Sequence, residues 1–392
     1  MTQNSYDFNN LIRDVSPDFD TLIANSPSFL RLLGSFGTSL NPITGAPVVT
    51  NTKYEWINDP MTQYSSAITA FDTDGNGTGI TLASTAGIEA GSILRFEKAT
   101  GASVTELVQV VSVDSATEIT VTRDYGSTTG VTLVVGDIAI LNSTPRQEDS
   151  DVGAAIKHQS EVDFNYTEIF DEVANLSGTA IASASYDNAT AMAIQVRAAM
   201  IRLARKLENA FLHGVKVQRT SSVKGTLGGL LQFISQSGGN IDATGGNLSE
   251  TLINNVIEDI VQDGGMLIDP VILCSPNQAR RISALNTAGT NPAVFKDIND
   301  RTLGGYTSAF IGDLPVDGGA TMAKVFVAQN MTKDKVAIID NNSISAKVMR
   351  GLTAKDATTN GTDGMKQRLL TELTLEVQNA KTGHGIITGL NV

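Results

Sequence analysis

The run with the most specific chemical pattern is a short stretch of oxygen-bearing side chains from Asp72 to Gly77. Its order, Asp-Thr-Asp-Gly-Asn-Gly, matches the first half of a calcium-binding loop, with oxygen donors at positions 1, 3 and 5 and glycine at position 6. The position of the bidentate glutamate is taken by Ala83, and no helical pattern flanks the run. Because a tight turn between two strands needs no ion, we predict a turn and no metal site, with calcium as the lesser alternative.

The three histidines, His158, His213 and His384, form no metal-binding or catalytic pattern, since none stands near a second His or Cys at ligand spacing. His213 lies at the C-terminus of a predicted helix, whose dipole favours a cation at that end. His384 is expected at solvent or against a neighbouring subunit. No Gly-x-Ser-x-Gly elbow, phosphate-binding loop or dinucleotide-binding glycine motif is present. We therefore expect no enzyme activity, no catalytic residue and no cofactor.

Charge is distributed unevenly along the chain. Between positions 197 and 224 there are seven Lys and Arg residues and a single acid, whereas positions 151 to 172 hold six acids and one lysine. Such opposed blocks could meet within one chain or between neighbours. Three interpretations of the basic stretch stay open: contact with packaged nucleic acid, pairing with the acidic strand region of a neighbouring subunit, and simple solvation. The candidate residues are Arg197, Arg202, Arg205, Lys206, Lys216, Arg219 and Lys224.

The composition predicts a folded, loop-rich protein of more than one domain. The chain has 392 residues, 41% hydrophobic and 18% charged, with 36 glycines. Its net charge of −13 argues against nucleic-acid binding through bulk charge. The one cysteine, Cys274, lies in an apolar run, which predicts a buried thiol. We see no signal peptide in residues 1–10 and no run near the ~20 apolar residues of a membrane span, so a soluble protein made in the cytoplasm is expected.

One long amphipathic helix is predicted from Asp187 to Gly214, with Asp187 or Asn188 as its N-cap and Gly214 as its stop. Its main apolar face comprises Met192, Val196, Ala199, Met200, Leu203, Leu207 and Phe211. A narrower apolar strip on another side comprises Ile194, Ala198, Ile201 and Leu212. A helix that is apolar on two sides must be covered on two sides. Together with a long extended region before it, such a helix is typical of proteins that interlock with copies of themselves.

A separate β module is predicted over residues 68–144. Turn signals divide this segment into candidate strands at 79–83, 92–96, 104–113, 118–123 and 131–141. Short strands at this spacing predict a small barrel or sandwich. The ends of such a module lie close together, which suits insertion into a loop.

The remainder of the chain mixes arms, strands and helices. Residues 1–46 predict an arm, and residues 47–59 a strand with Tyr54 and Trp56 on one side. Asn247 and Glu250 fit a capping box for a helix, and Ser275-Pro276 fits the start of a second helix after a buried strand at 271–274. Further strands are predicted at 306–311, 324–328, 335–340 and 344–350. The alternation of Leu373, Leu375 and Val377 with Thr374 and Glu376 predicts a half-buried strand.

The order of several segments resembles the major capsid proteins of tailed bacteriophages with the HK97 fold, in the branch of the phage SU10 major head protein. The matching segments are 28–33 with Thr52-Lys-Tyr-Glu-Trp and Asp59, for the N-terminal arm that enters the E-loop; 165–170, for the returning strand; 187–214, for the spine helix; 269–276, for the strand-to-helix step of the A domain; and 372–377 with 383–390, for the closing strand of the P domain.

The resemblance implies an α+β fold of the HK97 type with an inserted small all-β domain. It divides the chain into an N-terminal arm at 1–46, an E-loop at 47–67 and 145–180, the inserted β-barrel or sandwich at 68–144, a P domain at 181–246 and 341–392, and an A domain at 247–340. It carries no catalytic residue onto this chain.

The function implied by the resemblance is that of a major capsid protein whose hexamers and pentamers tile an icosahedral shell around double-stranded DNA. The expected location is the virion, after assembly in the host cytoplasm. Expected partners are copies of the chain, packaged DNA through non-specific contact, a separate scaffolding protein, the portal and decoration proteins, with no membrane. We expect no covalent cross-link. Two alternatives stay open: a tail or baseplate structural or binding module, and a carbohydrate-active enzyme with a β accessory domain.

Overall fold

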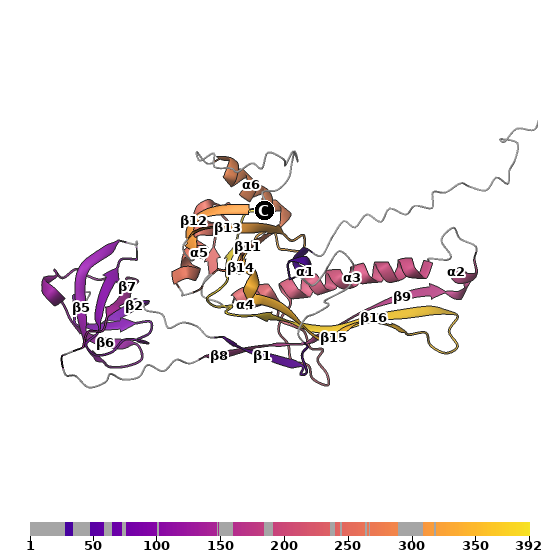
Figure 1. Ribbon diagram of the computed structural model, residues 1–392, viewed down its shortest axis with the longest axis horizontal. Coiled ribbons are helices and arrows are strands. Elements are labelled where there is room, and N and C mark those ends of the chain that lie inside the picture. Colours follow the sequence, from indigo (N-terminus) through magenta and orange to yellow (C-terminus); the bar gives the residue numbers. More distant parts are fainter. Residues whose placement is uncertain are drawn as a thin grey trace, which may run out of the picture. The chain divides into compact units, whose positions relative to one another are not determined.

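The computed structural model divides the chain into two compact units, of which unit 1 combines residues 1–58 and 162–392 and unit 2 spans residues 59–161 (Figure 1). The described residues are 28–33, 48–58, 65–72, 76–99, 102–146, 148, 160–183, 191–235, 240–243, 245–262, 265, 267–288, 309–316 and 319–392. The predicted N-cap Asp187 or Asn188, the histidine His158 and most of the predicted arm lie outside these residues.

Unit 2 contains a closed barrel of six antiparallel strands, in the order β2-β3-β6-β5-β4-β7. The strands are β2 (Ser65–Phe71), β3 (Gly79–Leu82), β4 (Ile93–Glu97), β5 (Ser103–Val113), β6 (Glu118–Thr122) and β7 (Ile138–Ser143). Alternate side chains point inward, as where Ile80 and Leu82 are buried on either side of the less buried Thr81. Leu94, Phe96 and other apolar residues complete this core.

The barrel differs from the predicted β module at both ends. β2 begins at Ser65, before the predicted boundary at residue 68, and the sequence Ser-Ser-Ala-Ile-Thr-Ala-Phe has too weak an apolar alternation to predict it. The strand predicted over 131–141 is wrong in its first half. Gly136 has a φ of +99°, and the carboxylate of Asp137 accepts a hydrogen bond from the backbone N–H of Val134 at 2.8 Å, so a turn precedes β7.

A buried ion pair fixes one end of the barrel. The carboxylate of Glu106 on β5 is fully buried and accepts two hydrogen bonds from the guanidinium of Arg123, from Nε at 2.6 Å and from a terminal nitrogen at 2.5 Å. It also accepts the backbone N–H of Val131 at 2.8 Å. Burial raises the pKa of Glu106, but these donors outweigh it and hold the pKa below its usual value. The bidentate pair ties the loop before β7 to the barrel wall.

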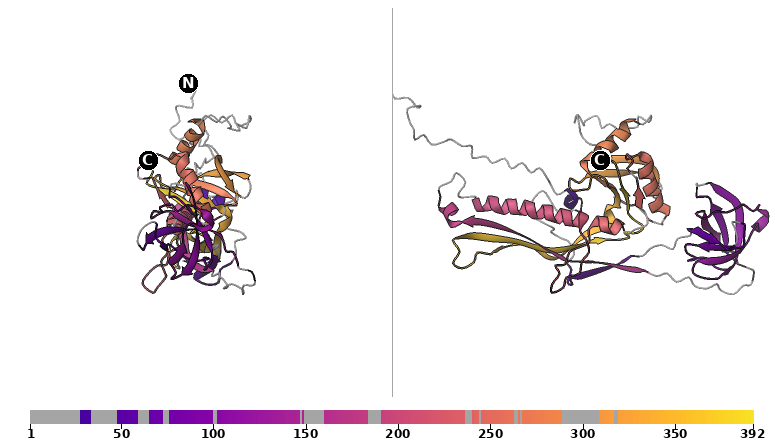
Figure 2. Two further views of the ribbon diagram at one scale, coloured as in Figure 1. Left: turned by 90° about the vertical axis from the view of Figure 1, so that its left-hand side faces the viewer. Right: turned by 180° about the vertical axis from the view of Figure 1, so that it is seen from behind.

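Unit 1 is built around a three-stranded antiparallel sheet, in the order β15-β16-β9, with a long helix along it (Figures 1 and 2). The strands are β15 (Ile344–Asp356), β16 (Gly364–Val377) and β9 (Glu168–Ser177), and the helices at this sheet are α2 (Gly178–Ala182) and α3 (Ala191–His213). The α3 helix is the predicted long helix. In the described part of the chain, no helix has both the length and the apolar character needed to cross a membrane.

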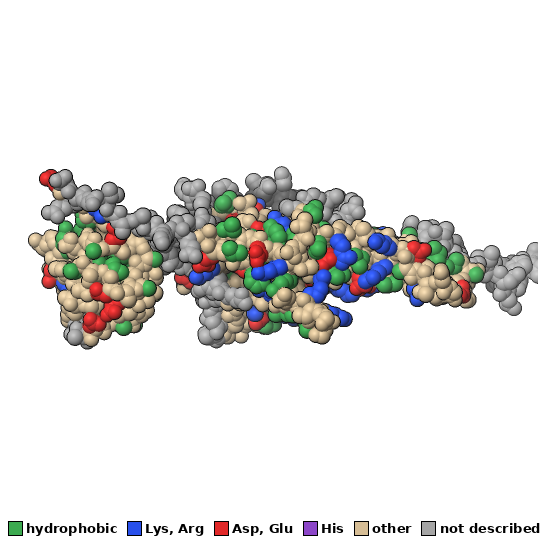
Figure 3. All heavy atoms as spheres, turned by 90° about the horizontal axis from the view of Figure 1, so that it is seen from below, with side chains coloured by type: hydrophobic (Ala, Val, Ile, Leu, Met, Phe, Trp, Pro, Cys, Tyr) green, Lys and Arg blue, Asp and Glu red, His purple; other side chains and the backbone are tan. Residues whose placement is uncertain are grey.

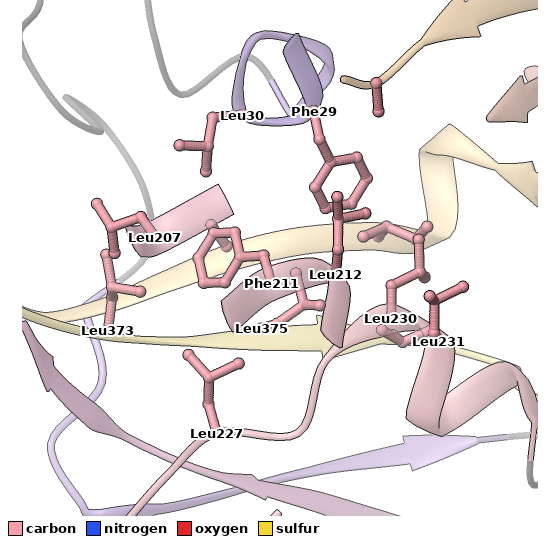
Figure 4. Close-up of a cluster of buried hydrophobic side chains, with 14 of the residues drawn as sticks. Phe29, Leu30, Leu207, Phe211, Leu212, Leu227, Leu230, Leu231, Leu373 and Leu375 are labelled. Atoms are coloured by element: carbon pink, nitrogen blue, oxygen red, sulfur yellow. The ribbon is translucent and has the colours of Figure 1, made fainter. Parts of the chain in front are cut away.

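The main core packs on the main apolar face of α3 and, in part, on its narrower apolar strip. Figure 4 shows Phe211 between Leu30 of α1 (Ser28–Leu32) and Leu373 and Leu375 of β16. Leu212, from the narrower strip, is fully buried beside Phe29 of the same short helix. Ile194, at the other end of that strip, is 37% exposed. Within the described residues the second strip is therefore covered only toward the C-terminal end of α3.

The chain leaves α3 through a loop that requires two glycines. Gly214, the predicted stop, donates its N–H to the carbonyl of Ala210 at 2.8 Å, and Gly229 donates to the carbonyl of Gly214 at 2.8 Å. A Cβ on Gly214 would lie 2.4 Å from the Ala210 oxygen, and one on Gly229 would lie 2.5 Å from the Gly214 nitrogen. Only glycine allows this close backbone approach, which brings residues 214–229 back to α4 (Leu230–Ser235).

A second sheet of six strands, in the order β10-β17-β14-β11-β13-β12, forms the other half of unit 1. Its strands are β10 (Asn240–Asp242), β11 (Pro270–Cys274), β12 (Ala309–Val316), β13 (Gly319–Val327), β14 (Val336–Asp340) and β17 (Gly385–Thr388), and its helices are α5 (Glu250–Gln262) and α6 (Pro276–Ala288). Ile253, Val256 and Ile260 of α5 pack on Ile272 and Ile338 in a second core. Cys274 is buried in this core, as predicted, and burial raises the pKa of its thiol to about 12.

Parallel pairing of Asn240 with Ile386 brings β10 and β17, from segments outside residues 247–340, into this sheet. One prediction near this sheet is wrong. The N-cap of α5 is Ser249, whose hydroxyl accepts the backbone N–H of Leu252 at 3.3 Å. The predicted cap Asn247 instead accepts a hydrogen bond from Arg281 at 2.8 Å.

A two-stranded ribbon is formed by β1 (Lys53–Asn58) and β8 (Glu161–Tyr166), which belong to unit 1 apart from Glu161. Trp56 is buried against Phe233 with ring centroids 5.8 Å apart, and Tyr54 is partly buried, as their alternation with the exposed Glu55 predicts. Ile57 and Val162, by contrast, are 68% and 64% exposed. The ribbon thus has one end packed on the body of unit 1 and apolar side chains in solvent.

Candidate assembly surface

The ribbon joins the body of unit 1 at four consecutive residues, Asn165 to Glu168, which we call the root. The side chain of Asn165 is fully buried; its nitrogen donates to the carbonyls of Leu375 at 2.8 Å and Gly228 at 3.0 Å. Its oxygen accepts the N–H groups of Gly228 at 2.7 Å and Tyr166 at 2.8 Å. This amide therefore connects the ribbon to strand β16 and to the loop after α3.

A buried carboxylate on β16 holds the next residue of the root. Glu372 is 3% exposed and accepts a hydrogen bond from the hydroxyl of Thr167 at 3.0 Å. It also accepts hydrogen bonds from Arg219 at 3.1 Å and Arg350 at 2.6 Å. Burial raises the pKa of Glu372, but the donors from Arg219, Thr167 and Arg350 outweigh it and lower the pKa. The carboxylate is thus held ionised between two guanidinium groups.

A second buried carboxylate, Glu376, holds the other strand of the ribbon. It accepts a hydrogen bond from the phenol of Tyr54 on β1 at 3.2 Å and an ion pair from Lys347 at 2.8 Å. The side chain of Gln378 donates to it at 2.6 Å. Burial again raises the pKa, and Lys347 and Gln378 outweigh it, so that the pKa of Glu376 is lowered. Both strands of the ribbon are therefore tied to the same body strand, β16.

These contacts correct the prediction of a half-buried strand. Thr374 and Glu376, which alternate with Leu373 and Leu375, are as buried as the leucines. The reason is that the root covers the second face of β16: the hydroxyl of Thr374 donates to the carbonyl of Tyr166 at 2.9 Å. Alternating polar residues here line a buried hydrogen-bonded layer instead of a solvent face.

The predicted basic residues pair with the acidic segment of the same chain. Glu172 of β9 accepts ion pairs from Arg202 at 3.2 Å and Lys206 at 2.5 Å, and burial, which raises the pKa of Glu172, is outweighed by these two cations. Lys216 lies 3.7 Å from Asp163 and donates to the carbonyl of Phe164 at 3.1 Å.

The remaining basic candidates are not gathered into one site. Arg219 joins Glu372 in the buried layer under the root. Arg197 and Lys224 form no ion pair with a described residue, and the Nε of Arg205 is buried without a described hydrogen-bond partner. Arg202 and Lys206 keep 46% and 57% of their side chains exposed. The basic stretch thus combines internal pairing with exposed charge.

The outer face of the three-stranded sheet, opposite α3, presents apolar and basic side chains together. Ile169 and Val173 are 40% and 45% exposed. Arg350 and Arg368 stand on the same face and reach Glu372 and Asp171 at 2.6 and 2.9 Å. Figure 3 shows Lys and Arg side chains gathered over the part of unit 1 where β9, β15 and β16 lie. Such a mixture is characteristic of a surface that contacts other protein.

Of the two described histidines, His213 lies at the predicted helix end, whereas His384 does not lie where it was predicted. His213 ends α3, and its Nε2 lies 2.8 Å from the carbonyl oxygen of Asn330. His384 is fully buried, which corrects the expectation of solvent or a neighbour. Its Nδ1 accepts the backbone N–H of Asp340 at 3.2 Å, and its Nε2 lies 3.2 Å from the carbonyl of Gln378. Burial lowers the pKa of His384 to about 4.

Among the described residues no group of three His, Cys, Asp or Glu side chains is placed to hold a metal ion. Asp72 and Asn76 belong to the connection between β2 and β3, but residues 73–75 of the calcium-like run lie outside the described part. Asn165, Thr167, Glu372 and Glu376 were not predicted as site residues.

This architecture is similar to that of known proteins. A model of the SU10 major capsid protein family matches residues 1–391. A chain of Mycobacterium phage Cain aligns with a TM-score of 0.51 and 14% identity over 100% of this chain and 99% of that one. A chain from the capsid of a native GTA particle aligns with a TM-score of 0.50 and 10% identity over 99% and 98%. A search of curated protein sequences finds no match.

The fold, with its mixed helices and strands, is therefore that of phage capsid proteins of the HK97 type. Both solved structures are distant in sequence, so they establish the fold, and the family match carries the identity. The chain belongs to the SU10 major capsid protein family. It is a major capsid protein of a tailed bacteriophage and a structural part of the virion, which confirms the resemblance and favours it over a tail or baseplate module.

Proposed function

We propose that this protein forms hexamers and pentamers that close into an icosahedral shell around double-stranded DNA. The observation that carries the proposal is the ribbon, whose Ile57 and Val162 are about two-thirds exposed. An isolated two-stranded ribbon is marginally stable in water, and apolar side chains in solvent gain free energy when a neighbour covers them. The exposed surface is thus of the kind that self-association buries.

The domain assignment follows from the same proposal. The N-terminal arm spans residues 1–46, the E-loop 47–67 and 145–180, the P domain 181–246 and 341–392, and the A domain 247–340. The barrel is proposed as an insertion within the E-loop, because the strands β1 and β8 of the ribbon precede and follow it in the chain. We propose that it projects from the outer shell surface or bridges neighbours. Deleting the barrel without any loss of assembly or shell stability would remove the bridging role.

We propose two kinds of subunit contact. The exposed apolar and acidic side chains of the ribbon, such as Val162 and Glu161, complement Ile169, Val173 and Arg368 on the outer sheet face of a neighbour. The exposed charges of Arg202 and Lys206 meet either a neighbouring subunit or packaged DNA. Charge reversal at Arg202 and Lys206 tests the second contact. Unaltered assembly together with unaltered DNA packaging would count against both roles.

The remaining partners are proposed from the family role. A separate scaffolding protein guides assembly in the host cytoplasm, and the shell receives a portal and decoration proteins. We propose no enzyme activity and no cofactor, since the shell role requires neither. Gel electrophoresis under denaturing conditions checks the expected lack of covalent cross-links, because cross-linked shells give a ladder of multimers.

The deciding experiment is electron microscopy of the expressed chain, with its mass measured in solution, with and without the scaffolding protein of the phage. Closed shells, or pentamers and hexamers that resemble capsomers, are expected. A monomer or small ring that never closes, even with scaffolding protein, would overturn the proposed assembly.

A further inference from the structure

Several directed hydrogen bonds hold the root in place. Asn165 alone makes four, to Leu375, Gly228 and Tyr166, and every polar atom of its side chain is paired. The backbone N–H of Thr167 donates to the carbonyl of Thr52 at 2.9 Å, and its carbonyl accepts Arg219 at 3.2 Å. The root therefore contacts the residue just before β1, the strand β16 and the loop after α3.

The ribbon has few other contacts that could determine its direction. Beyond the root, the described contacts between ribbon and body include Trp56 against Phe233 and the hydrogen bond of Tyr54 to Glu376. The side-chain oxygen of Asn58 accepts the N–H of Asn379 at 3.0 Å, and Lys216 contacts Asp163 and Phe164. Apolar contacts such as the one between Trp56 and Phe233 have no strong directional preference. Hydrogen bonds weaken steeply when their angles change, so a fully paired buried amide fixes an angle as well as a position.

We propose that Asn165 is the positioning residue of shell assembly: it sets the angle at which the ribbon leaves the body, before any neighbour binds. The chain itself shows why an angle must be set here. Among the described strands β8 pairs only with β1. The next strand, β9, starts two residues later and pairs with β16, so the chain changes sheets at Thr167. Without directed hydrogen bonds at that point, the angle of the ribbon would depend on the contacts that β1 and Lys216 make with the body.

The hydrogen bonds of Asn165, which we call the lock, connect the ribbon to two elements of the body. On the body side, Leu375 supplies a carbonyl from β16, and Gly228 supplies both its N–H and its carbonyl from the loop after α3. A Cβ on Gly228 would lie 2.9 Å from the Gln232 side-chain oxygen and 3.1 Å from the Phe233 ring, so this loop is held tightly in place. Asn165 thus fixes the angle of the ribbon relative to two elements of the body, the strand β16 and the loop after α3.

The inference rests on the proposed self-assembly, and its test has a readout that does not. Hydrogen exchange of the full chain before assembly is compared for wild type, Asn165→Ala and the control Asn175→Ala, whose side chain lies exposed on β9. In Asn165→Ala the amides of β1 and β8 are expected to exchange roughly tenfold faster or more, since unpaired buried groups are left behind. Amides of α3 and the control variant are expected to match wild type.

The second readout is the geometry of the assemblies seen by electron microscopy. Asn165→Ala is expected to give shells of mixed diameter or open sheets, whereas Asn175→Ala gives wild-type shells. A purely structural role predicts less folded protein but shells of normal size. Wild-type diameters together with wild-type ribbon exchange in folded Asn165→Ala overturn the inference. A wild-type chain that never forms shells refutes the proposed function instead, and the exchange data still decide the role of Asn165.

Two milder variants decide the case in which Asn165→Ala does not fold. Thr167→Val removes the hydroxyl that binds Glu372, and Thr374→Val removes the one that binds Tyr166. Each leaves the apolar core intact. Faster exchange confined to the ribbon supports the lock, and exchange unchanged from wild type in both variants overturns it.

Discussion

The carboxylate of Glu168 accepts a hydrogen bond from the backbone N–H of Leu227 at 3.0 Å, while no Lys or Arg of the described residues pairs with it. Glu372 and Glu376, on the adjacent strand, have cationic partners and lowered pKa values. Burial raises the pKa of Glu168, and the single hydrogen bond offsets this only in part. The root therefore contains one carboxyl group whose charge is unfavourable to folding.

Replacing this group should stabilise the body at neutral pH. In Glu168→Gln the amide oxygen still accepts the Leu227 N–H, and the buried charge is gone. Because the folded-state pKa is raised, the wild-type carboxyl lowers stability only as pH rises from its unfolded pKa through its folded pKa. Urea unfolding followed by the fluorescence of Trp56, the only tryptophan, should show a gain at pH 7 and none at pH 4. An equal gain at both pH values would contradict the explanation by charge.

The buried His384 should make the body sensitive to acid. Its folded-state pKa of about 4 lies below the usual 6.5, since burial disfavours the charged ring. The unfolded state therefore binds a proton first, and stability falls as pH drops from 6.5 toward 4, by about 3 kcal/mol in total. His384→Gln should lose less over the same range. Unfolding free energies of both proteins at pH 7 and pH 4 give the comparison; equal losses would exclude His384 as the source.

The centre of the main core should be intolerant of truncation. Phe211 is fully buried between Leu30 and Leu375, and Phe211→Ala is expected to cost about 3–5 kcal/mol through lost burial and a cavity. Ile194→Ala on the same helix is the matched control, since that side chain is 37% exposed and should cost well under ~1 kcal/mol. Urea unfolding of the two variants measures the difference, and similar costs would refute the packing around α3.

The buried ion pair of the barrel offers a test confined to unit 2. Arg123→Met leaves the fully buried Glu106 without its cation, which is expected to destabilise the barrel by about 3–5 kcal/mol. Hydrogen exchange should then accelerate in β5 and β6 but not in α3. Arg95→Met, which breaks the exposed pair with Glu97, serves as the control and should change little. Normal exchange in β5 and β6 of Arg123→Met would show that the pair contributes nothing.

Local pattern is sufficient where a residue's neighbours in sequence decide its environment. The period of α3 and the alternation in the barrel strands β3 to β6 have this character, and their positions follow the predictions closely. The strand β2 was missed because its small polar residues resemble a loop. The family was recognisable from the order of weak motifs, none of which is decisive alone.

The root was beyond local pattern because its partners are distant in sequence. Asn165 binds Leu375 across 210 positions, and Thr167 binds Glu372 across 205. A lone Asn or Thr in a strand gives no signal of such a partner. The alternation of glutamates with leucines in β16 was visible, but it predicted a solvent face, because an ionised carboxylate is seldom buried unless cations from other segments meet it. The burial of His384 was also missed, because the backbone N–H of Asp340 that binds its ring lies 44 positions away in the sequence.

The closed barrel has a practical consequence. Its first and last strands are neighbours, with Ser65 of β2 paired to Ile140 of β7, so the chain enters and leaves the barrel side by side. All six strands find their partners within the barrel, which leaves no open strand edge to recruit other chains. These are the properties of an exchangeable cassette. A foreign domain with adjoining termini, put in place of the barrel from the start of β2 to the end of β7, would be displayed in as many copies as the shell has subunits.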